Sequence, residues 1–341
     1  MREHNIGKEG QQRQARFVLM TPGQGSQFPG MGAKLAEHPA AAAVFREADE
    51  ILGFPLSEQM FDPSGNALKD NAIAQPAIIA ATIAANEIFL SEHPEIINVI
   101  PSFYIGHSLG ELTALYFSGV LSGRDALIIA HERGKLMQQA TEQTPGGMIT
   151  IRTEKNLEYV KENDILAVDT ICRGTGVYLA TYNSPAHVTI SGLANNIEEA
   201  ARLLVKTKFQ FMPLRNVPPS HTPYMQPVIQ ELMDFIERKG IIFHDPNAPV
   251  LLNYTGKEEY RGEGIKRGFL AQLVNPVRFE QGITFARSHG HGIFVEFGPK
   301  SILSGFIPYI FGKYSQAYFS THPIVDIESA KASSAIIRAL G

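Results

Sequence analysis

The sequence feature that most constrains the fold is the segment Gly106-His107-Ser108-Leu109-Gly110, which follows an apolar run and precedes a helical pattern. A Gly-x-Ser-x-Gly segment in this position predicts a sharp turn from a strand into a helix, because small residues beside the serine keep the turn free of clashes. The start of the helix adds positive potential and a free N–H group next to the hydroxyl. We therefore interpret Ser108 as a nucleophile; the alternative is a chance Gly-Ser-Gly loop.

A serine nucleophile needs a base, and the chain has eleven histidines. His221 lies in the segment Val-Pro-Pro-Ser-His-Thr-Pro, where prolines on both sides restrict the backbone and hold the ring in place. His107 is adjacent to Ser108, but on such a turn its side chain is expected to point elsewhere. His289 and His291 have no nearby carboxylate at metal-ligand spacing, which favours loop histidines over a metal site. Spacing alone makes His221 the first candidate and leaves the others open.

Length and cysteine content limit the class of protein. A chain of 341 residues is long enough for two domains or one elaborated domain, and it can bury a core without disulfide or metal support. Its single cysteine, Cys172, excludes a disulfide framework and any thiolate zinc or iron–sulfur site.

Charge and hydropathy indicate a soluble protein. Thirty Lys and Arg against 34 Asp and Glu give a net charge of −4, which implies no general attraction to nucleic acid or to anionic membranes. The most apolar stretch, residues 73–90, contains Gln75, Pro76, Asn86 and Glu87, which a bilayer span would not carry. Because the N-terminus has no apolar secretory segment, we expect a cytoplasmic protein.

The pattern of expected secondary structure changes at Pro145-Gly146-Gly147, from long helices to short strand-like and helical runs. We expect residues 1–16 to form a flexible N-terminal extension and the fold to begin at Phe17. From 146 to 214, short strand-like and helical runs alternate as in a small ferredoxin-like α+β subdomain, inserted into a larger α/β domain made of 17–145 and 215–341. The strand-like runs are Met148–Ile151, Val177–Tyr182 and Val188–Ser191, and the helical runs are Asn156–Glu162 and Asn196–Val205.

The chain resembles the malonyl-CoA:acyl-carrier-protein transacylases over about residues 17 to 310. Eight motifs occur in the order found in that family: Thr21-Pro-Gly-Gln-Gly-Ser-Gln27, Gln75-Pro-Ala77, Gly106-His-Ser-Leu-Gly-Glu111, Arg133-Gly-Lys-Leu-Met-Gln138, Tyr182-Asn-Ser-Pro185, Ser220-His221, Gln272-Leu-Val-Asn-Pro-Val-Arg-Phe279 and Glu296-Phe-Gly-Pro299. The resemblance implies an α/β-hydrolase-like core with an inserted ferredoxin-like subdomain. It also implies a free-standing acyltransferase of fatty-acid or polyketide synthesis.

The resemblance also implies catalytic roles at matching positions. Ser108 would carry the acyl group as an ester, and His221 would act as general base and then as general acid. The main chain near Gln272 and Asn275, rather than a carboxylate, would orient the imidazole. Gln24 and the N–H of Leu109 would form the oxyanion hole. From the residues alone, the preferred interpretation of Gln24 is a polar loop residue that satisfies its own turn.

Arg133 is expected on an apolar helix face. On a helix that begins at the N-cap candidate Ser122, it shares a face with Ala126, Ile129, Ala130 and Met137. A buried arginine is costly unless a carboxylate or a set of carbonyls meets it. The resemblance supplies the free carboxylate of malonate, held by two hydrogen bonds from the guanidinium. The alternative is an arginine that reaches solvent or pairs with a buried acid.

Two further positions concern the acyl group. The resemblance places Met137 and Ser220 at the substrate. Polyketide acyltransferases often have an aromatic residue where Ser220 stands, so a branched or larger acyl unit stays open. The donor would be malonyl-CoA, with no bound cofactor and no metal.

The expected macromolecular partner is a holo acyl carrier protein. We expect this chain itself to be a monomer. Such carriers are acidic, so a local positive patch is needed on a mildly negative chain. Arg202, Lys206 and Lys208 are candidates; the alternative is a set of cations that complement a helix end and solvent. A serine acyl hydrolase or editing thioesterase acting on carrier proteins, or an acyltransferase for another acyl unit, remains the alternative function.

Overall fold

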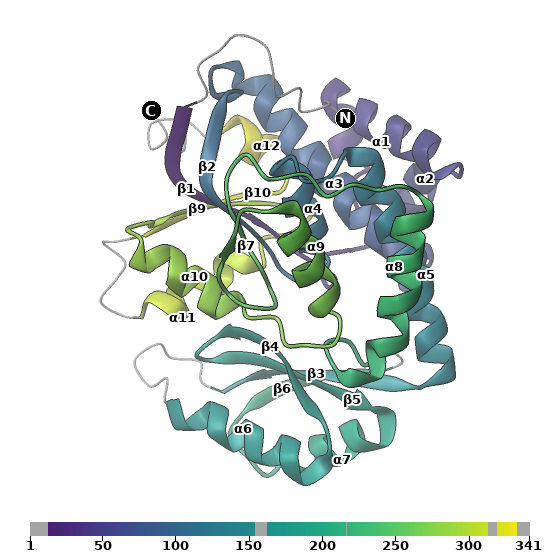
Figure 1. Cartoon of the computed structure of the whole chain (residues 1–341), viewed down its shortest axis with the longest axis vertical. Coiled ribbons are helices and arrows are strands. Elements are labelled where there is room, and N and C mark those ends of the chain that lie inside the picture. Colours follow the sequence, from purple (N-terminus) through teal and green to yellow (C-terminus); the bar gives the residue numbers. More distant parts are fainter. Residues whose placement is uncertain (1–12, 154–161, 216, 313–318, 333–341) are drawn as a thin grey trace.

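The computed structural model describes residues 13–153, 162–215, 217–312 and 319–332. Within them the chain forms an α/β structure with two sheets (Figure 1). The larger sheet is mixed and has the strand order β10-β9-β1-β2-β7-β8, in which only the β7–β8 pairing is antiparallel. Its strands are β1 Arg13–Thr21, β2 Val99–Gly106, β7 Val250–Leu251, β8 Glu258–Glu259, β9 Ile293–Phe297 and β10 Ser320–Ile324.

Strand β1 lies inside the larger sheet, between β9 and β2, and is buried on both faces. Phe17 and Leu19 belong to one apolar core, and Val18 and Met20 belong to another on the opposite face. This double burial explains why the strand is a continuous apolar run rather than an alternating one. The strand begins at Arg13, which pairs with Val99, so the expected extension over 1–16 is wrong for residues 13–16. Residues 1–12 lie outside the described part of the chain.

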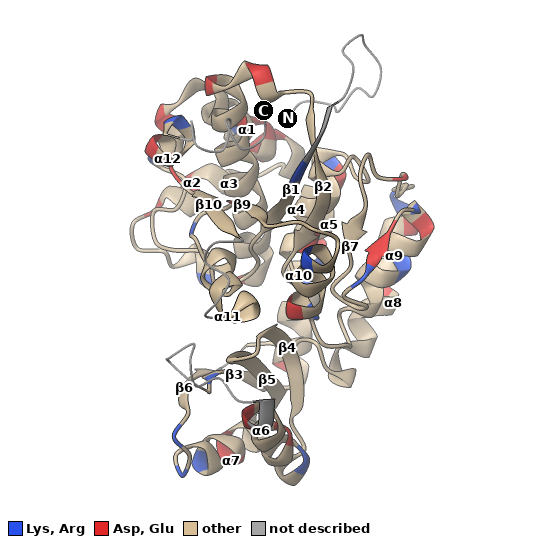
Figure 2. Cartoon of the chain, turned by 90° about the vertical axis from the view of Figure 1, so that its left-hand side faces the viewer, with Lys and Arg blue, Asp and Glu red and all other residues tan. Residues whose placement is uncertain are grey.

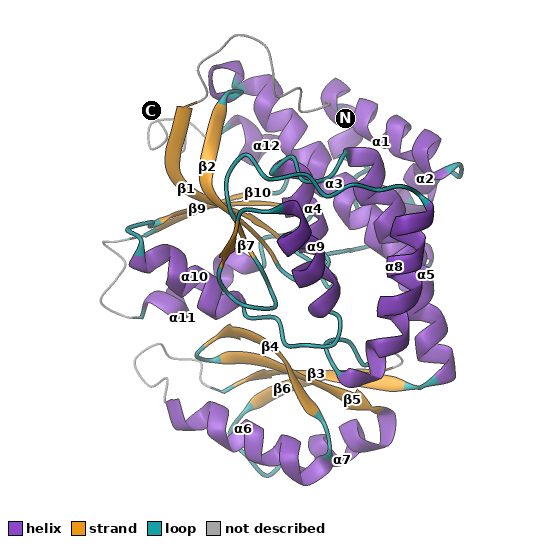
Figure 3. Ribbon diagram, viewed as in Figure 1, coloured by secondary structure: helices purple, strands orange, loops and turns teal. Residues whose placement is uncertain are grey.

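Helices cover both faces of the larger sheet (Figure 3). Helices α1, α3 and α12 lie on one side, and α10 and α11 on the other. The bounds are α1 Pro39–Leu52, α2 Leu56–Phe61, α3 Asn71–Glu92, α4 Gly110–Phe117, α5 Gly123–Gln143, α8 Gln226–Arg238, α9 Gly262–Ala271, α10 Phe279–Ser288, α11 Ile307–Phe311 and α12 Ile327–Lys331. The expected helix start at Ser122 is confirmed, since the Ser122 hydroxyl accepts from the N–H of Asp125 and caps α5.

Helix α3 is the apolar helix of the main core. By length and composition alone it could cross a membrane, but 89% of its most apolar window is buried inside the protein. Pro76 lies within it and has no N–H to donate to the carbonyl of Ala72. The Nδ1 atom of His131 on α5 instead lies 2.8 Å from that carbonyl oxygen. The two helices are therefore joined where the proline would leave a backbone group unpaired.

The smaller sheet is antiparallel and runs in the order β4-β5-β3-β6. Its elements follow one another as β3 Gly146–Arg152, α6 Glu162–Thr175, β4 Tyr178–Ser184, β5 His187–Leu193, α7 Ala194–Leu204 and β6 Gln210–Arg215. The alternation of strands and helices that the sequence predicts is confirmed. Residues 156–161 of the helix expected over Asn156–Glu162 lie outside the described residues, and the described helix α6 begins at Glu162.

The two faces of the smaller sheet have different neighbours. Ile149 and Ile151 of β3 pack in a core with α6 and α7, on the side away from the larger sheet (Figure 1). Met148 and Thr150 lie on the other face and line a pocket between the two sheets. The main chain of Val277, which precedes α10, exchanges hydrogen bonds with β4 and joins the smaller sheet to the larger part.

The close contact between α3 and α5 can be tested at Gly134. A Cβ atom there would lie 2.3 Å from the carbonyl oxygen of Asn71. We expect Gly134→Ala to lower the free energy of unfolding by about 2 kcal/mol, because backbone must move to relieve the clash. Gly174 on α6 is the control, since its Cβ would meet no atom within 4 Å.

Gly174→Ala should leave stability unchanged or raise it by up to about 1 kcal/mol through helix propensity. Urea unfolding of both variants measures the difference. Equal effects of the two substitutions would contradict the close contact.

Candidate active site

Ser108 sits on the turn between β2 and α4 with a backbone φ of 52°. This left-handed conformation is uncommon for a residue other than glycine and costs about 1–3 kcal/mol. The flanking glycines make it possible: a Cβ at Gly106 would lie 2.2 Å from the nitrogen of Glu111, and one at Gly110 would lie 2.1 Å from the oxygen of Thr21. The spacing in the sequence therefore reflects two close backbone contacts.

The Ser108 hydroxyl lies next to a histidine. Its Oγ is 2.8 Å from Nε2 of His221, and Nδ1 of His221 is 2.7 Å from the main-chain oxygen of Gln272. A carbonyl can only accept, so Nδ1 carries the proton and Nε2 is left to accept from the serine. His221 also has a left-handed φ, of 62°, and its N–H donates to the carbonyl of Leu273. The structure thus brings together Ser108, His221 and Gln272.

Burial sets the charge of the histidine. His221 is 4% exposed, and burial lowers its pKa from 6.5 to about 3, against the opposing effect of the Gln272 carbonyl. The main chain of Asn275 also opposes this lowering of the pKa, whereas the side chain of Asn275 donates to the carbonyl of Ala271. At neutral pH the imidazole is therefore uncharged and able to accept a proton.

Two main-chain N–H groups belong to the turn and to the loop that contacts it. A Cβ at Gly23 would lie 2.2 Å from the carbonyl oxygen of His107 and 3.4 Å from the nitrogen of Leu109, so the loop that carries Gln24 touches the turn. The N–H groups of Gln24 and Leu109 have no hydrogen-bond acceptor among the described residues. The Gln24 side chain is engaged elsewhere, with Asn71 and Gln75.

Arg133 on α5 is 1% exposed and lines the same pocket. One guanidinium nitrogen donates to Oε1 of Gln75 at 2.7 Å, and its Nε has no partner among the described residues. Burial lowers its pKa to about 10, and the negative charge of Glu111 partly opposes that shift. With a pKa of about 10 the guanidinium stays protonated at neutral pH. The pocket is therefore lined by a buried positive charge whose Nε has no hydrogen-bond partner among the described residues.

The pocket that contains these groups has a volume of about 280 Å³. Met137 and Ser220, both expected at the substrate, line it, as do Ser108, His221 and Gln24. The full lining is Gln24, Gly25, Gln27, His107, Ser108, Arg133, Met137, Met148, Thr150, Thr181, Thr189, Leu214, Val217, Pro218, Ser220 and His221.

Sequence reasoning missed several polar residues of the site. His107 lines the pocket, but its Nε2 lies 2.7 Å from Oδ1 of Asn183 on β4 rather than from Ser108. Asn253, after β7, accepts from the N–H of Ser108 through its Oδ1 at 2.7 Å. Gln75 and Asn183 belong to two of the motifs that carry the family resemblance, so that resemblance could have identified them. Asn253 belongs to none of these motifs, and no pattern in its neighbourhood of the sequence indicated a role.

The cations expected at a docking surface lie outside this pocket. Arg202 belongs to α7, on the face of the smaller sheet away from the pocket, and pairs with Glu199. Lys208 lies 3.6 Å from Asp164, and Lys206 is exposed. Figure 2 shows acidic as well as basic residues along α7. Arg202 therefore lies away from the pocket, and docking through these cations stays a prediction.

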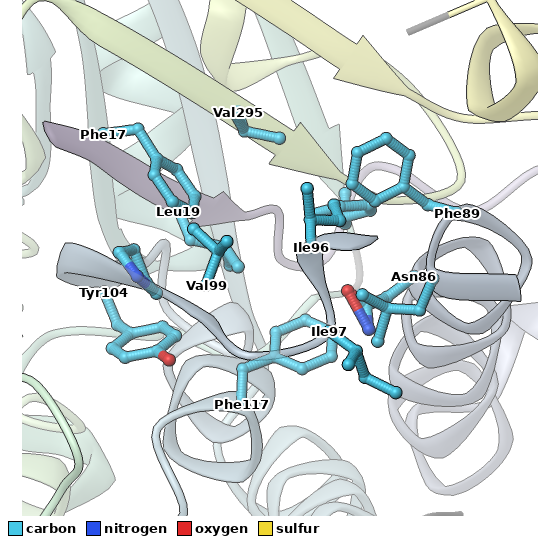
Figure 4. Close-up of a pocket in the computed structure, with 13 residues that line it drawn as sticks. Phe17, Leu19, Asn86, Phe89, Ile96, Ile97, Val99, Tyr104, Phe117 and Val295 are labelled. Carbon is cyan, nitrogen blue, oxygen red and sulfur yellow. The ribbon is translucent and has the colours of Figure 1, made fainter. Parts of the chain in front are cut away.

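A second pocket, whose lining does not include Ser108, lies among apolar side chains of β1, β2 and α3 (Figure 4). Phe17, Leu19 and Phe89 line it, with Asn86 and Tyr104 as the polar side chains. It contains no nucleophile and no charged group, so it offers no catalytic chemistry. Among the described residues, no group of three or more His, Cys, Asp or Glu could hold a metal ion.

Comparisons with known proteins agree on one family. The acyl transferase domain family matches residues 17–308. The malonyl CoA-acyl carrier protein transacylase of Bacillus subtilis is 34% identical over 296 residues, which cover 86% of this chain and 90% of that protein. The crystal structure of an acyl carrier protein S-malonyltransferase from Vibrio cholerae is similar with a TM-score of 0.81 and 29% identity, and it covers 94% of this chain and 100% of that one. A type II PKS acyl-carrier protein in complex with its malonyl-transacylase gives a TM-score of 0.80 and 32% identity, with coverage of 96% and 99%.

The low pKa of His221 predicts a pH dependence of stability. Because the folded-state pKa is lowered to about 3 from 6.5, the unfolded chain takes up the proton first, and stability falls as pH drops from about 6.5 toward 3. His221→Asn removes this titration and can still donate to the Gln272 carbonyl. We expect the unfolding temperature of the wild type to fall more steeply than that of the variant between pH 7 and 4.5. Parallel curves from calorimetry would show that His221 titrates normally.

Proposed function

The chain belongs to the acyl transferase domain family, and we propose that it moves a malonyl or related carboxyacyl group from coenzyme A to the phosphopantetheine thiol of an acyl carrier protein. One arrangement carries the proposal: the hydrogen-bonded Ser108 and His221 share a pocket with the buried cation of Arg133. A nucleophile and base alone would suit many acyl thioesters. The buried cation adds a preference for an acyl group that carries its own carboxylate.

In the first half-reaction, Ser108 attacks the thioester carbonyl while its hydroxyl proton passes to Nε2 of His221. The C–S bond then breaks, and the coenzyme A thiolate takes the proton back from His221. In the second half-reaction, the carrier thiol gives its proton to His221 and attacks the seryl ester. Collapse of that intermediate returns the proton to Ser108 and leaves the acyl group on the carrier.

Each half-reaction passes through a tetrahedral oxyanion. The N–H groups of Gln24 and Leu109 have no acceptor in the described part of the chain, and Leu109 belongs to the turn that the Gln24 loop contacts, so we assign both groups to this oxyanion. The neutral ring of His221 becomes a cation in the same step, and the Gln272 carbonyl stabilises the proton on Nδ1. A carbonyl in this place does the orienting work that a carboxylate does in a Ser-His-Asp triad.

Arg133 is assigned to the substrate carboxylate. Gln75 holds one guanidinium nitrogen, and Arg133 lines the same pocket as Ser108. Met137 lies one turn further along α5, and its sulfur is 3.4 Å from Nε2 of Gln75. Met137 and Ser220 would then contact the acyl group itself.

The proposal includes the organisation of the chain. We propose an α/β-hydrolase-like domain made of 17–145 and 215–341, with an inserted ferredoxin-like subdomain at 146–214. The strand order β4-β5-β3-β6 with two helices on one face supports the second part. Malonyl-CoA is the proposed donor, without a bound cofactor.

The partner is a holo acyl carrier protein, and the enzyme is expected to act as a monomer in the cytoplasm. Docking through Lys206 and Lys208 stays a prediction, whereas the position of Arg202 on the far face of the small sheet argues against its participation.

Intact-protein mass spectrometry tests the acyl-enzyme. Brief incubation with malonyl-CoA should add one malonyl group to the wild type and none to Ser108→Ala. Addition of a holo carrier protein should then move that group to the carrier. Release of free malonate without a stable adduct would instead indicate a serine hydrolase.

The role of Arg133 is tested by comparing two donors. For Arg133→Ala we expect Ser108 acylation by malonyl-CoA to slow roughly 100-fold or more, because a buried carboxylate would lose its charged partner. Acylation by acetyl-CoA should change much less. The ratio of the two rates corrects for any general loss of folding, and an unchanged ratio would rule out the assigned contact.

A further inference from the structure

Glu111 is a fully buried carboxylate that the reaction steps above do not use. It lies in the first turn of α4, three residues after Ser108. Its Oε2 accepts from the N–H of Asn253 at 2.7 Å, and its Oε1 accepts from Nε2 of Gln272 at 3.1 Å. No ion pair between described residues joins it to Arg133, so these two neutral donors are its direct partners.

The two partners of Glu111 hold the two catalytic groups. Asn253 accepts from the N–H of Ser108 at 2.7 Å and donates to the carbonyl of Gly106 at 2.6 Å, which clamps the left-handed turn from both sides. Gln272 holds Nδ1 of His221 through its main-chain oxygen at 2.7 Å. Its side-chain amide also reaches the carbonyl oxygen of Ser108 at 3.4 Å. Glu111 is thus the one described side chain that contacts both clamps.

A purely structural role would explain burial at a helix start, where negative charge is stabilised. It would not explain why both oxygens contact residues that fix the reacting pair. We propose that Glu111 is a positioning residue whose carboxylate, through Asn253 and Gln272, keeps the Ser108 hydroxyl and the His221 ring at reacting distance. The inference rests on the proposed function only in taking Ser108 as nucleophile and His221 as base.

The charge state of Glu111 then controls reactivity near neutral pH. Burial raises its pKa from 4.5 to about 7, against the opposing effects of the Asn253 and Gln272 hydrogen bonds and of Arg133 on α5. Protonation of the Glu111 carboxylate would place its O–H group against one of its two donors, the N–H of Asn253 or Nε2 of Gln272, and would weaken that hydrogen bond. The other titratable groups of the site are His107 and His221, and burial lowers both of their pKa values. His221 stays neutral to well below pH 6, so a loss of reactivity near pH 7 would not come from the base.

The test measures the reaction of Ser108 with a fluorophosphonate, which forms an Oγ–P bond, releases fluoride and needs no acyl-CoA. Labelling rates are followed by intact mass from pH 5.5 to 9. In the wild type we expect the rate to fall as pH drops below about 7. Glu111→Gln keeps the shape of the side chain but places an amide N–H₂ group against the N–H of Asn253 or Nε2 of Gln272. It should label on the order of 10- to 100-fold more slowly at pH 8, as expected when reacting groups shift by about 1 Å, and show no inflection near pH 7.

Glu296→Gln is the matched control. Glu296 is also a fully buried carboxylate, but it accepts from the N–H groups of residues 302–304, away from Ser108. This variant should keep the wild-type rate and pH profile. Equal slowing in both variants would reduce the role of Glu111 to general core stability and overturn the proposal.

Gln272→Met provides a second variant if Glu111→Gln does not fold. It removes the amide that contacts Glu111 but keeps the main-chain carbonyl that holds His221. We expect slower labelling and a weaker pH dependence. The inference is refuted if a folded Glu111→Gln or Gln272→Met variant labels within threefold of the wild-type rate and keeps the inflection near pH 7. If the wild type labels normally but forms no malonyl adduct, the acyl-transfer proposal fails and this inference stands.

Discussion

The left-handed turn at Ser108 is the constraint on which the site depends. A serine with a φ of 52° is held there by close packing at Gly106 and Gly110 and by the hydrogen bonds of Asn253. The strain is local, and the surrounding sheet, with β1 and β2 in parallel register up to Thr21 and Gly106, provides the rigid frame that sustains it. The turn places Ser108 on the wall of the pocket, and the next residue, Leu109, has an N–H without an acceptor among the described residues.

Two buried charges surround this turn and do different work. Arg133 borders the pocket and has a donor, Nε, without a partner among the described residues, which is how a binding group is arranged. Glu111 has both oxygens occupied by protein donors and faces the supports of Ser108 and His221, which is how a scaffold group is arranged. An isolated buried charge is expensive, and each partly offsets the cost of the other by its field. Glu111 is met by donors from two segments, whereas Arg133 has one hydrogen-bond partner among the described residues, Gln75.

Parts of this arrangement were readable from sequence because they are local. In the Gly-x-Ser-x-Gly turn the close contact at Gly106 involves the nearby Gly110 and Glu111, whereas the close contact at Gly110 involves the distant Thr21. The cap at Ser122 and the alternation of strands and helices after Gly146 are also local patterns. His221 stood out through its flanking prolines, but the residues alone did not choose it among eleven histidines. The start of β1 was misplaced, because Arg13 joins the sheet through backbone pairing with Val99 that no side-chain pattern reports.

The sequence by itself determined the turn, the helix that carries Arg133 and the alternation of strands and helices over residues 146–214, since each follows largely from residues close together in the chain. Only the tertiary structure decided which distant groups meet there. Asn253 is 145 positions from Ser108, and Gln272 is 51 from His221 and 161 from Glu111. Contacts over such separations depend on how β7 and α9 pack against β2 and α4. Only the folded chain therefore shows that Glu111 accepts from both Asn253 and Gln272.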